Sequence, residues 1–289
     1  MRRLLPPQPY TRAAVYPSLL RLLAAGLFAL SRGSLPLILV RMVVSTNPPI
    51  TPAIVMRLFV LFTVIPAGVA WLIERSASAE LELRAGVLTA RRRRSMVEVP
   101  CDAIERIEPW SVPFPGPGFS FVMRSGERLR HAFQVTDPKP LLYELADRGH
   151  VEAAHAAVRH PVIVWAHAKA VVPRTFWDRA AVKFIAFAVV PGTLWFYTRQ
   201  RISYGSFLGE YYASGLGEWL ATLVLHWITA ALYLVLYASL LRGVAESFAL
   251  AAASVAPLSA IPLRRGVEVA YRVLFYGGVV AMLLVRHTA

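Results

Sequence analysis

Long apolar segments constrain the fold of this chain more than any other feature of its sequence. Several of them reach the roughly 20 residues that a helix needs to cross the hydrocarbon core of a bilayer. They lie on both sides of a charged stretch at residues 79–149. Charged residues make up only 17% of the chain, whereas an ordinary soluble domain carries about 25%. The sequence therefore predicts an α-helical integral membrane protein with one soluble insert.

The apolar segments predict about six transmembrane helices. Two precede the insert, at Ser18–Val44 and Ala53–Ile73, and an uncharged turn joins them. The segments after the insert are Ala180–Tyr197, Glu218–Leu241, Gly243–Leu263 and Gly266–Val285. The segment Gly243–Leu263 is only weakly apolar, so five spans are an alternative, with this segment staying on the cytoplasmic side.

Charge interrupts the first apolar segment. Arg21, Arg32 and Arg41 lie within Ser18–Val44, together with Pro36. An Arg side chain at mid-bilayer costs roughly 2.5–3.5 kcal/mol on insertion scales. The segment is therefore interpreted either as one kinked span or as an interfacial helix followed by a shorter dip into the membrane.

The same segments divide the chain into four parts. These are an N-terminal arm with two transmembrane helices (1–75), a soluble domain (76–150), a helical connector (151–179) and a C-terminal bundle of three to four transmembrane helices (180–289). The first 17 residues are interpreted as a polar arm. Within the bundle, Thr198–Leu216 is expected to be a loop rich in aromatic side chains.

The soluble insert has the pattern of a small α+β domain. Leu81 and Leu83 alternate with charged residues, which is typical of a half-buried strand. Ala85-Gly86 and Ser125-Gly126 are hairpin-type turns, and a short helical turn is expected over Asp102–Glu108. Asp137-Pro138 is a helix start, and Gly149 is a helix stop. We expect antiparallel strands with one helix over Pro138–Arg148, and inward-facing side chains at Leu81, Leu83, Val87, Phe121 and Leu129.

The order of these elements resembles a known family. The sequence runs through "RAGVL", "TARRRRSMVEVP" and "DAIERIE", then a hairpin, and closes with "DPKPLLYELA". It is similar to the bacterial PH-like domain of small membrane proteins, in which the domain commonly follows a pair of transmembrane helices. The resemblance implies a partly open β-barrel with a C-terminal helix, and a role in binding or scaffolding more than in catalysis. It covers residues 79–149 only.

The distribution of charge points to a membrane and not to nucleic acid. The net charge is +14, yet residues 75–178 hold 15 Lys/Arg and 12 Asp/Glu, a net of +3, which leaves +11 for the rest of the chain. Most of the excess therefore flanks or lies within apolar segments, as topology and lipid headgroups require. The basic arm (Arg2, Arg3, Arg12) and the neutral loop at 45–52 place the N-terminus and the soluble domain in the cytoplasm.

The source and compartment are read from composition. Only three of the 31 basic residues are Lys, a bias typical of GC-rich bacterial genomes. Cys101 is the only cysteine, so no intrachain disulfide forms. We therefore expect a multi-pass protein of the bacterial cytoplasmic (inner) membrane.

Four consecutive arginines are the first candidate site. Basic residues held close to a membrane attract anionic headgroups, at about 1 kcal/mol each. Arg91, Arg92, Arg93 and Arg94 are therefore lipid-binding candidates. The alternative is a solvated strand and turn that follows the positive-inside rule.

Ionisable residues within the apolar segments are the second set of candidates, because such residues are functional hypotheses by default. They are His226, Glu246, Glu268 and Arg272. Glu268 and Arg272 are four residues apart and share a helix face. They either form a site or pair with each other and extend to the interface.

Aromatic residues of the expected C-terminal loop are the third set. Tyr and Trp collect at membrane interfaces and are also enriched in protein interfaces. Tyr204, Tyr211, Tyr212 and Trp219 are therefore either interfacial anchors or a docking surface for another membrane protein.

The sequence predicts no catalytic residue, metal site or cofactor. P-loop, G-x-S-x-G, H-E-x-x-H, G-x-G-x-x-G and zinc-type Cys pairs are all absent from it. His150, His155, His160 and His167 are five, five and seven residues apart, whereas a metal-binding pair on a helix needs three or four.

These observations favour a non-catalytic scaffold, assembly factor or accessory subunit. Its partners would be membrane lipids and another membrane protein, and not nucleic acid. The alternative is a lipid-handling membrane enzyme or transporter that uses the intramembrane Glu, Arg and His side chains.

Overall fold

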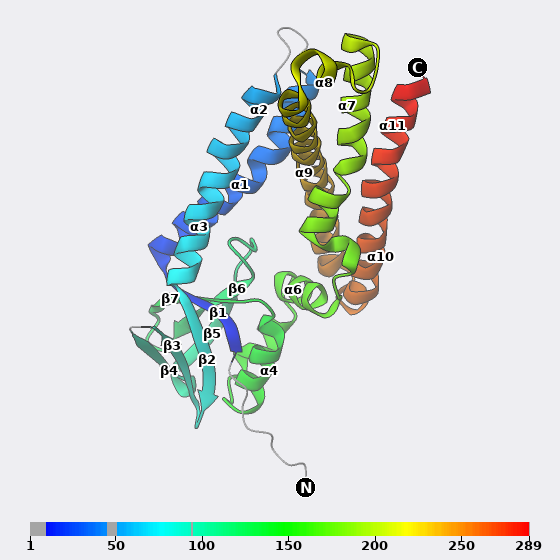
Figure 1. The fold of residues 1–289 in the computed structure, drawn as a ribbon. Coiled ribbons are helices and arrows are strands. Elements are labelled where there is room, and N and C mark those ends of the chain that lie inside the picture. The colour runs from blue at the N-terminus through cyan, green and yellow to red at the C-terminus, as the bar shows by residue number, and fades with distance from the viewer. Residues whose placement is uncertain (1–9, 45–50, 94, 289) are drawn as a thin grey trace. The chain divides into compact units, whose positions relative to one another are not determined.

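The structure is a computed structural model that describes residues 10–44, 51–93 and 95–288 (Figure 1). It is mostly helical, with one seven-stranded antiparallel sheet. The chain forms two compact units. The first comprises Met1–Ser31, Phe62–Val172 and Glu246–Val267, and the second comprises Arg32–Leu61, Pro173–Ala245 and Glu268–Ala289.

The sheet forms the centre of the first unit. Its strand order is β4-β3-β2-β1-β7-β6-β5, and every described pairing is antiparallel. The strands are β1 (Tyr10–Pro17), β2 (Ser78–Arg84), β3 (Val87–Arg92), β4 (Met96–Pro100), β5 (Ile104–Pro109), β6 (Gly118–Met123) and β7 (Arg128–Val135). Glycines with positive φ at Gly86 and Gly126 form the expected β2–β3 and β6–β7 turns.

The N-terminal arm is partly a strand, which corrects the expectation of a polar arm over residues 1–17. Strand β1 pairs with β2 on one side and with β7 on the other. Its run Ala13–Tyr16 is buried on both faces of the sheet: Ala13 and Val15 join one apolar cluster, and Ala14 and Tyr16 join another. Residues 1–9 lie outside the described part of the chain.

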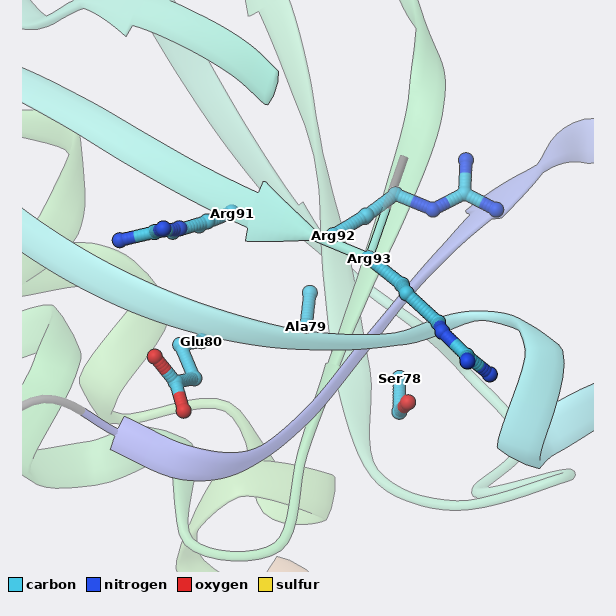
Figure 2. A pocket seen from close by; sticks show the side chains of 6 residues that line it. All are labelled: Ser78, Ala79, Glu80, Arg91, Arg92 and Arg93. Atoms are coloured by element: carbon cyan, nitrogen blue, oxygen red, sulfur yellow. The ribbon is translucent and has the colours of Figure 1, made fainter. Parts of the chain in front are cut away.

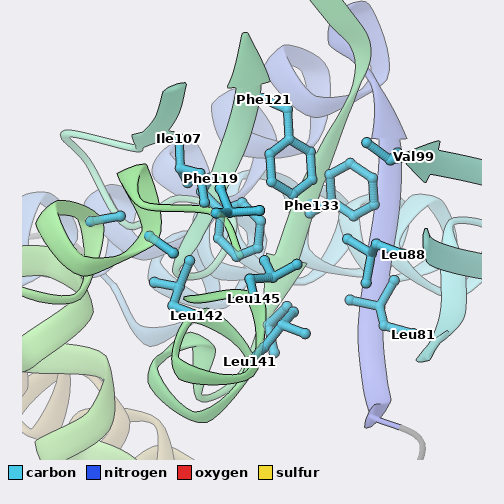
Figure 3. Packing of buried hydrophobic residues seen from close by; sticks show 14 of the residues in the cluster. Leu81, Leu88, Val99, Ile107, Phe119, Phe121, Phe133, Leu141, Leu142 and Leu145 are labelled. Carbon is cyan, nitrogen blue, oxygen red and sulfur yellow. The ribbon is translucent and has the colours of Figure 1, made fainter. Parts of the chain in front are cut away.

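An apolar core covers one face of the sheet, as Figure 3 shows. The rings of Phe119, Phe121 and Phe133 contact one another with centroids 5.1–6.1 Å apart. Helix α4 (Pro138–Asp147) packs its leucines Leu141, Leu142 and Leu145 against this cluster. The short helix α5 (Ala153–Val158) also contributes to the core. Of the side chains expected to face inward, Leu81, Leu83 and Phe121 are buried, and Val87 and Leu129 are partly buried.

Local sequence signals explain the edges of these elements. The Asp137 carboxylate accepts a hydrogen bond from the Lys139 backbone N–H and caps α4, with Pro138 as its first residue. The expected helical turn over Asp102–Glu108 is shorter than predicted. A 3₁₀ turn covers Cys101–Ala103, and Ile104 already begins β5.

Within the described residues, four helical segments are long and apolar enough to cross a membrane, and they fit the expected membrane protein. They are Ser18–Met42, Pro52–Ser76, Leu216–Val255 and Pro257–Leu284. The first belongs to α1 (Ser18–Val44), one continuous helix with Pro36 inside it. The second runs through α2 (Pro52–Phe59), the π-helical turn η1 (Val60–Val64) and α3 (Ile65–Ser76). The turn expected at 45–52 lies largely outside the described residues.

The region after the sheet differs from the expected spans. The connector contains α6 (Pro161–Val171) and the 3₁₀ turn η3 (Phe176–Asp178). The expected third span corresponds to the π-helical turn η4 (Val182–Ala186) and α7 (Val189–Tyr204). The expected aromatic loop is largely helical, because α7 continues to Tyr204 and α8 (Gly209–Ser214) follows.

No separate helix covers Gly243–Leu263. Helix α9 (Leu216–Val255) continues without interruption through the first half of this segment. The turn η5 (Pro257–Ser259) then leads into α10 (Ala260–Arg272). The small residues after Leu241 do not break a helix, and the first proline is Pro257. The π-helical turn η6 (Val273–Gly277) and α11 (Gly278–Thr288) complete the chain.

Candidate functional site

A cationic groove lies at the end of β3. It has a volume of about 540 Å³ and is lined by Ser78, Ala79, Glu80, Arg91, Arg92 and Arg93. The antiparallel register sets Glu80 opposite Arg91 and Ala79 opposite Arg92. Figure 2 shows Arg92 and Arg93 turned to one side of the strand end, and Arg91 turned to the same side as Glu80. Arg94 lies outside the described residues.

The groove is close to the end of a candidate membrane span. Helix α3 ends at Ser76, and Ser78 already lines the groove. The Ser78 hydroxyl donates to the Arg75 carbonyl at 2.8 Å, and the Gln134 amide of β7 donates to the Glu74 carboxylate at 2.9 Å. These contacts attach the helix end to the sheet. Because Arg92 pairs with Ala79 across the sheet, and Ala79 is three residues after Ser76, the arginines lie about three strand residues, or roughly 10 Å, from the end of α3.

The charge of the groove is positive. Arg91 and Arg93 are exposed, and none of the three described arginines forms an ion pair with a described residue. The only acid among the lining residues is Glu80. Burial, and then the charge of Arg92, lowers the pKa of His131 below its ordinary value. The groove therefore suits an anion, and Arg guanidinium groups match phosphate geometry well.

The polar side chains among the described lining residues are one hydroxyl, one carboxylate and three guanidinium groups. The hydroxyl belongs to Ser78 and donates to the Arg75 carbonyl, so the groove offers mainly positive charge and hydrogen-bond donors. Comparison with protein-family models, with curated proteins and with solved structures found no match. The function is therefore inferred from the residues of the chain themselves.

Glu246 is engaged in a polar cluster of the first unit. Arg264 donates two hydrogen bonds to its carboxylate, at 2.7 and 2.9 Å. The Trp165 indole N–H donates to it at 3.1 Å, and the Lys169 ammonium lies 3.2 Å away. Trp165 and Lys169 belong to α6, whereas Glu246 and Arg264 belong to α9 and α10. The cluster therefore joins the connector to the end of α9.

Glu268 and Arg272 have separate partners, which corrects the expectation that they pair with each other. Glu268 accepts from Arg242 at 2.7 Å. Arg272 contacts the Asp178 carboxylate, with its Nη2 at 3.0 Å, and Lys183 lies 3.3 Å from the same carboxylate. Both residues lie on the same helix face, and that face packs against neighbouring segments. Those segments supply Arg242 as the partner of Glu268 and Asp178 as the partner of Arg272.

The pKa of Asp178 reflects this environment. Burial alone raises it, but hydrogen bonds from Thr175 and Arg272 and the charge of Lys183 outweigh burial and hold it well below the usual range. The carboxylate is therefore ionised at neutral pH. The side chains of Asp178 and Lys183 are 11% and 7% exposed, so this is a largely buried ion pair.

His226 and the aromatic candidates lie in the second unit, where Trp219 and His226 both contact the ring of Phe196, with ring centroids 5.2 and 5.9 Å away. The ring nitrogen Nδ1 of His226 is 2.7 Å from the Thr222 carbonyl. The Trp219 indole donates to the Phe207 carbonyl. Tyr211 and Tyr212 contact each other on α8, and the latter is 76% exposed. Tyr204 is exposed at the end of α7.

Sequence reasoning missed several buried polar residues. Asp178, Lys183, Arg242 and Arg264 were not singled out, and neither was Glu210. The Glu210 carboxylate accepts hydrogen bonds from Gln200 and Thr222. One signal was present for Glu210, which is one of only five acids outside residues 75–178. An acid that is rare among apolar segments has to find a partner there.

Proposed function

We propose that this protein is a non-catalytic membrane scaffold or accessory subunit. Its sheet domain binds anionic lipid headgroups beside its own transmembrane helices, and its membrane helices bind a partner membrane protein. The observation that carries the proposal is the groove lined by Arg91, Arg92 and Arg93, because Arg92 pairs with Ala79, three residues after the end of α3.

Electrostatics supports lipid as the ligand. A basic residue near an anionic surface contributes about 1 kcal/mol, and the effect decays within about a Debye length. The short connection from α3 keeps the groove within that range. Three arginines acting together would supply a substantial part of the affinity for a headgroup.

The ion-paired residues of the membrane segments support a scaffold over a lipid-handling enzyme. A general acid or base has to reach substrate, yet Glu246, Glu268 and Arg272 are held by protein partners at 2.7–3.2 Å. Such contacts hold helices together. We also propose a PH-like fold for the sheet domain, because it has seven antiparallel strands followed by helix α4.

For the membrane topology, we favour five spans with the sheet domain in the cytoplasm of a bacterium. Helix α9 has 40 residues, or about 60 Å, twice the thickness of a hydrocarbon core of about 30 Å. Its last part packs Ala249 and Ala253 against α6, and would lie outside the bilayer. Residues 243–263 would then stay cytoplasmic, and Arg264 and Arg265 would follow the positive-inside rule.

Lipid titration of the full chain tests the proposal. The full chain is needed because β1, a central strand, precedes the first span and would be missing from an isolated insert. We would titrate protein in neutral detergent with phosphatidylglycerol or phosphatidylcholine of equal chain length and count bound lipid by native mass spectrometry. Changing Arg91, Arg92 and Arg93 to Gln should weaken binding of the anionic lipid only, and salt should have the same effect.

A matched control removes the same charge elsewhere. Changing Arg84, Arg106 and Arg148 to Gln also removes three exposed arginines of the first unit but leaves the groove intact. A second readout is His131: an anion on Arg92 offsets the charge that lowers its pKa, so lipid should raise that pKa. Equal loss of lipid in both triple variants, with no change at His131, would reject the groove.

The partner interface is proposed on Tyr211 and Tyr212. Both are exposed on the short helix α8. Changing both to Ala should leave insertion and folding intact and reduce recovery of a partner membrane protein in mild detergent. Unchanged recovery would leave only a role as interfacial anchors.

A further inference from the structure

A second groove lies in the second compact unit, called the helical unit below, and we draw a separate inference from it. It has a volume of about 580 Å³ and lies between the end of α7, the first half of α9 and the first residue of α2. Its lining residues are Pro52, Trp195, Thr198, Arg199, Ile202, Ser203, Leu225, His226, Thr229 and Tyr233.

The groove is rich in hydrogen-bond donors and contains no acid among the described lining residues. Arg199 is exposed and makes no hydrogen bond or ion pair with any described residue. The indole N–H of Trp195 is buried and has no hydrogen-bond partner within the described chain. A buried donor without a partner is costly, and a cation near it makes an anion the best-matched acceptor.

The lining also includes apolar side chains that are exposed. Ile202 is 80% exposed and Leu225 is 56% exposed. The aromatic residues of the same region, among them Tyr204 and Trp219, are of the kind that gathers where headgroups meet acyl chains. A ligand here would therefore have one charged end and one apolar end.

We infer that this groove binds an anionic amphiphile, a lipid with a phosphate or carboxylate headgroup. Its anionic oxygens would accept hydrogen bonds from Arg199 and from the Trp195 indole. Its acyl chain would lie along Ile202 and Leu225. The site is distinct from the arginines of β3 and does not depend on them.

Binding to the full chain tests this inference. The background would carry Arg91→Gln, Arg92→Gln and Arg93→Gln, so that the first groove contributes nothing. The probes are dioctanoyl phosphatidylglycerol, dioctanoyl phosphatidylcholine and inorganic phosphate, in neutral detergent. We expect measurable binding of the anionic lipid, weaker binding of the zwitterionic lipid and no competition by millimolar phosphate.

Variants of two α7 residues test where the lipid headgroup binds. Arg199→Gln should weaken binding of the anionic lipid about tenfold or more, the size expected for one charge-assisted hydrogen bond. Arg199→Lys should restore part of it. Trp195→Phe keeps the ring and removes the donor, and it should weaken binding by a smaller factor. It also serves as the test if Arg199→Gln fails to fold.

The control is Arg201→Gln, which removes an equal charge two residues away. Arg201 donates to the Gly205 carbonyl and does not line the groove. Equal losses in Arg199→Gln and Arg201→Gln would overturn the site in favour of a general charge effect. Equal binding of both lipids, or displacement of the lipid by phosphate alone, would overturn an anionic amphiphile as the ligand.

Discussion

The core of the sheet domain and the C-terminal helices are stabilised in different ways. The sheet core is apolar throughout, from Val15 on β1 to Ile163 on α6, and its charged groups lie outside it. The helical unit instead buries charge, with Lys183 only 6% and Glu268 only 9% exposed. The core of the sheet domain is held together by apolar packing, whereas the helical unit also contains ion pairs that lie beside aromatic rings.

The solvent on each side explains the difference. Apolar burial drives folding in water at roughly 25 cal/mol per Å², so the sheet domain needs no buried polar partner. Between helices in lipid this force is absent, and packing and polar contacts decide which faces meet. Asp178 therefore specifies an arrangement in the helical unit, whereas Phe133 supplies stability in the sheet.

The largest expected effect is on the sheet. Phe133→Ala removes a ring that contacts both Phe119 and Phe121, and a truncation of this kind costs about 3–5 kcal/mol. We expect proteolysis within the sheet domain at a lower denaturant concentration, while the helical unit stays resistant. Phe248→Ala, at a 60% exposed site, is the control. Equal sensitivity of the two variants would contradict an apolar core.

Removing the shared carboxylate is the matching change in the helices. Asp178→Ala leaves Lys183 and Arg272 without the acid that both contact. Breaking a buried pair from one side costs about 3–5 kcal/mol. The melting temperature of the helical signal in detergent should fall, and Glu218→Ala, at an exposed acid, should leave it unchanged. Identical melting of the two variants would show that the charges are not coupled.

Acidification is a graded form of the same experiment. The folded-state pKa of Asp178 lies below the unfolded value of about 3.9. The carboxylate therefore stabilises the folded state fully above the unfolded pKa, and this stability is lost as the pH falls toward the folded pKa. Melting temperature should drop more steeply below about pH 4 in the wild type than in Asp178→Asn. Parallel curves would exclude Asp178 as the titrating group.

Sequence reasoning reached local features best. The alternation at Leu81 and Leu83, the two Gly turns and the capped helix after Asp137 each depend on neighbours in the chain, and the structure has them. The clearest apolar run, Ala53–Ile73, lies within one helical segment, Pro52–Ser76. Periodicity, turn chemistry and capping are sufficient for such elements.

Long-range pairing was not predictable in the same way. Strand β1 is separated from β2 by two candidate spans, and its short run Ala13–Tyr16 has no alternation because both faces are buried. The face of α10 that carries Glu268 and Arg272 was predictable from their spacing. Their partners, Arg242 and Asp178, depend on which segments pack together, and a helical period holds no information about that.

The smallest expected effect is that of replacing Glu268 and Arg242 together. It tests whether this ion pair determines which helices meet or contributes to the stability of the helical unit. Glu268→Leu alone leaves Arg242 facing a site without its carboxylate at 2.7 Å, and should be strongly destabilising. Replacing both partners, Glu268→Leu with Arg242→Met, exchanges a partly buried pair, whose Arg242 side chain is 34% exposed, for apolar side chains. Such exchanges are often neutral or stabilising, so the double variant should melt close to the wild type, within about 1 kcal/mol.

A double-mutant cycle measures the coupling between the two residues. Thermal unfolding of the wild type, both single variants and the double variant would be followed by the helical signal in one detergent. Recovery of stability in the double variant would assign the pair to specifying which helices meet, because stability would no longer require it. A double variant as unstable as Glu268→Leu would instead mean that the charges themselves stabilise the helical unit, and the contrast with the sheet would then be one of stability.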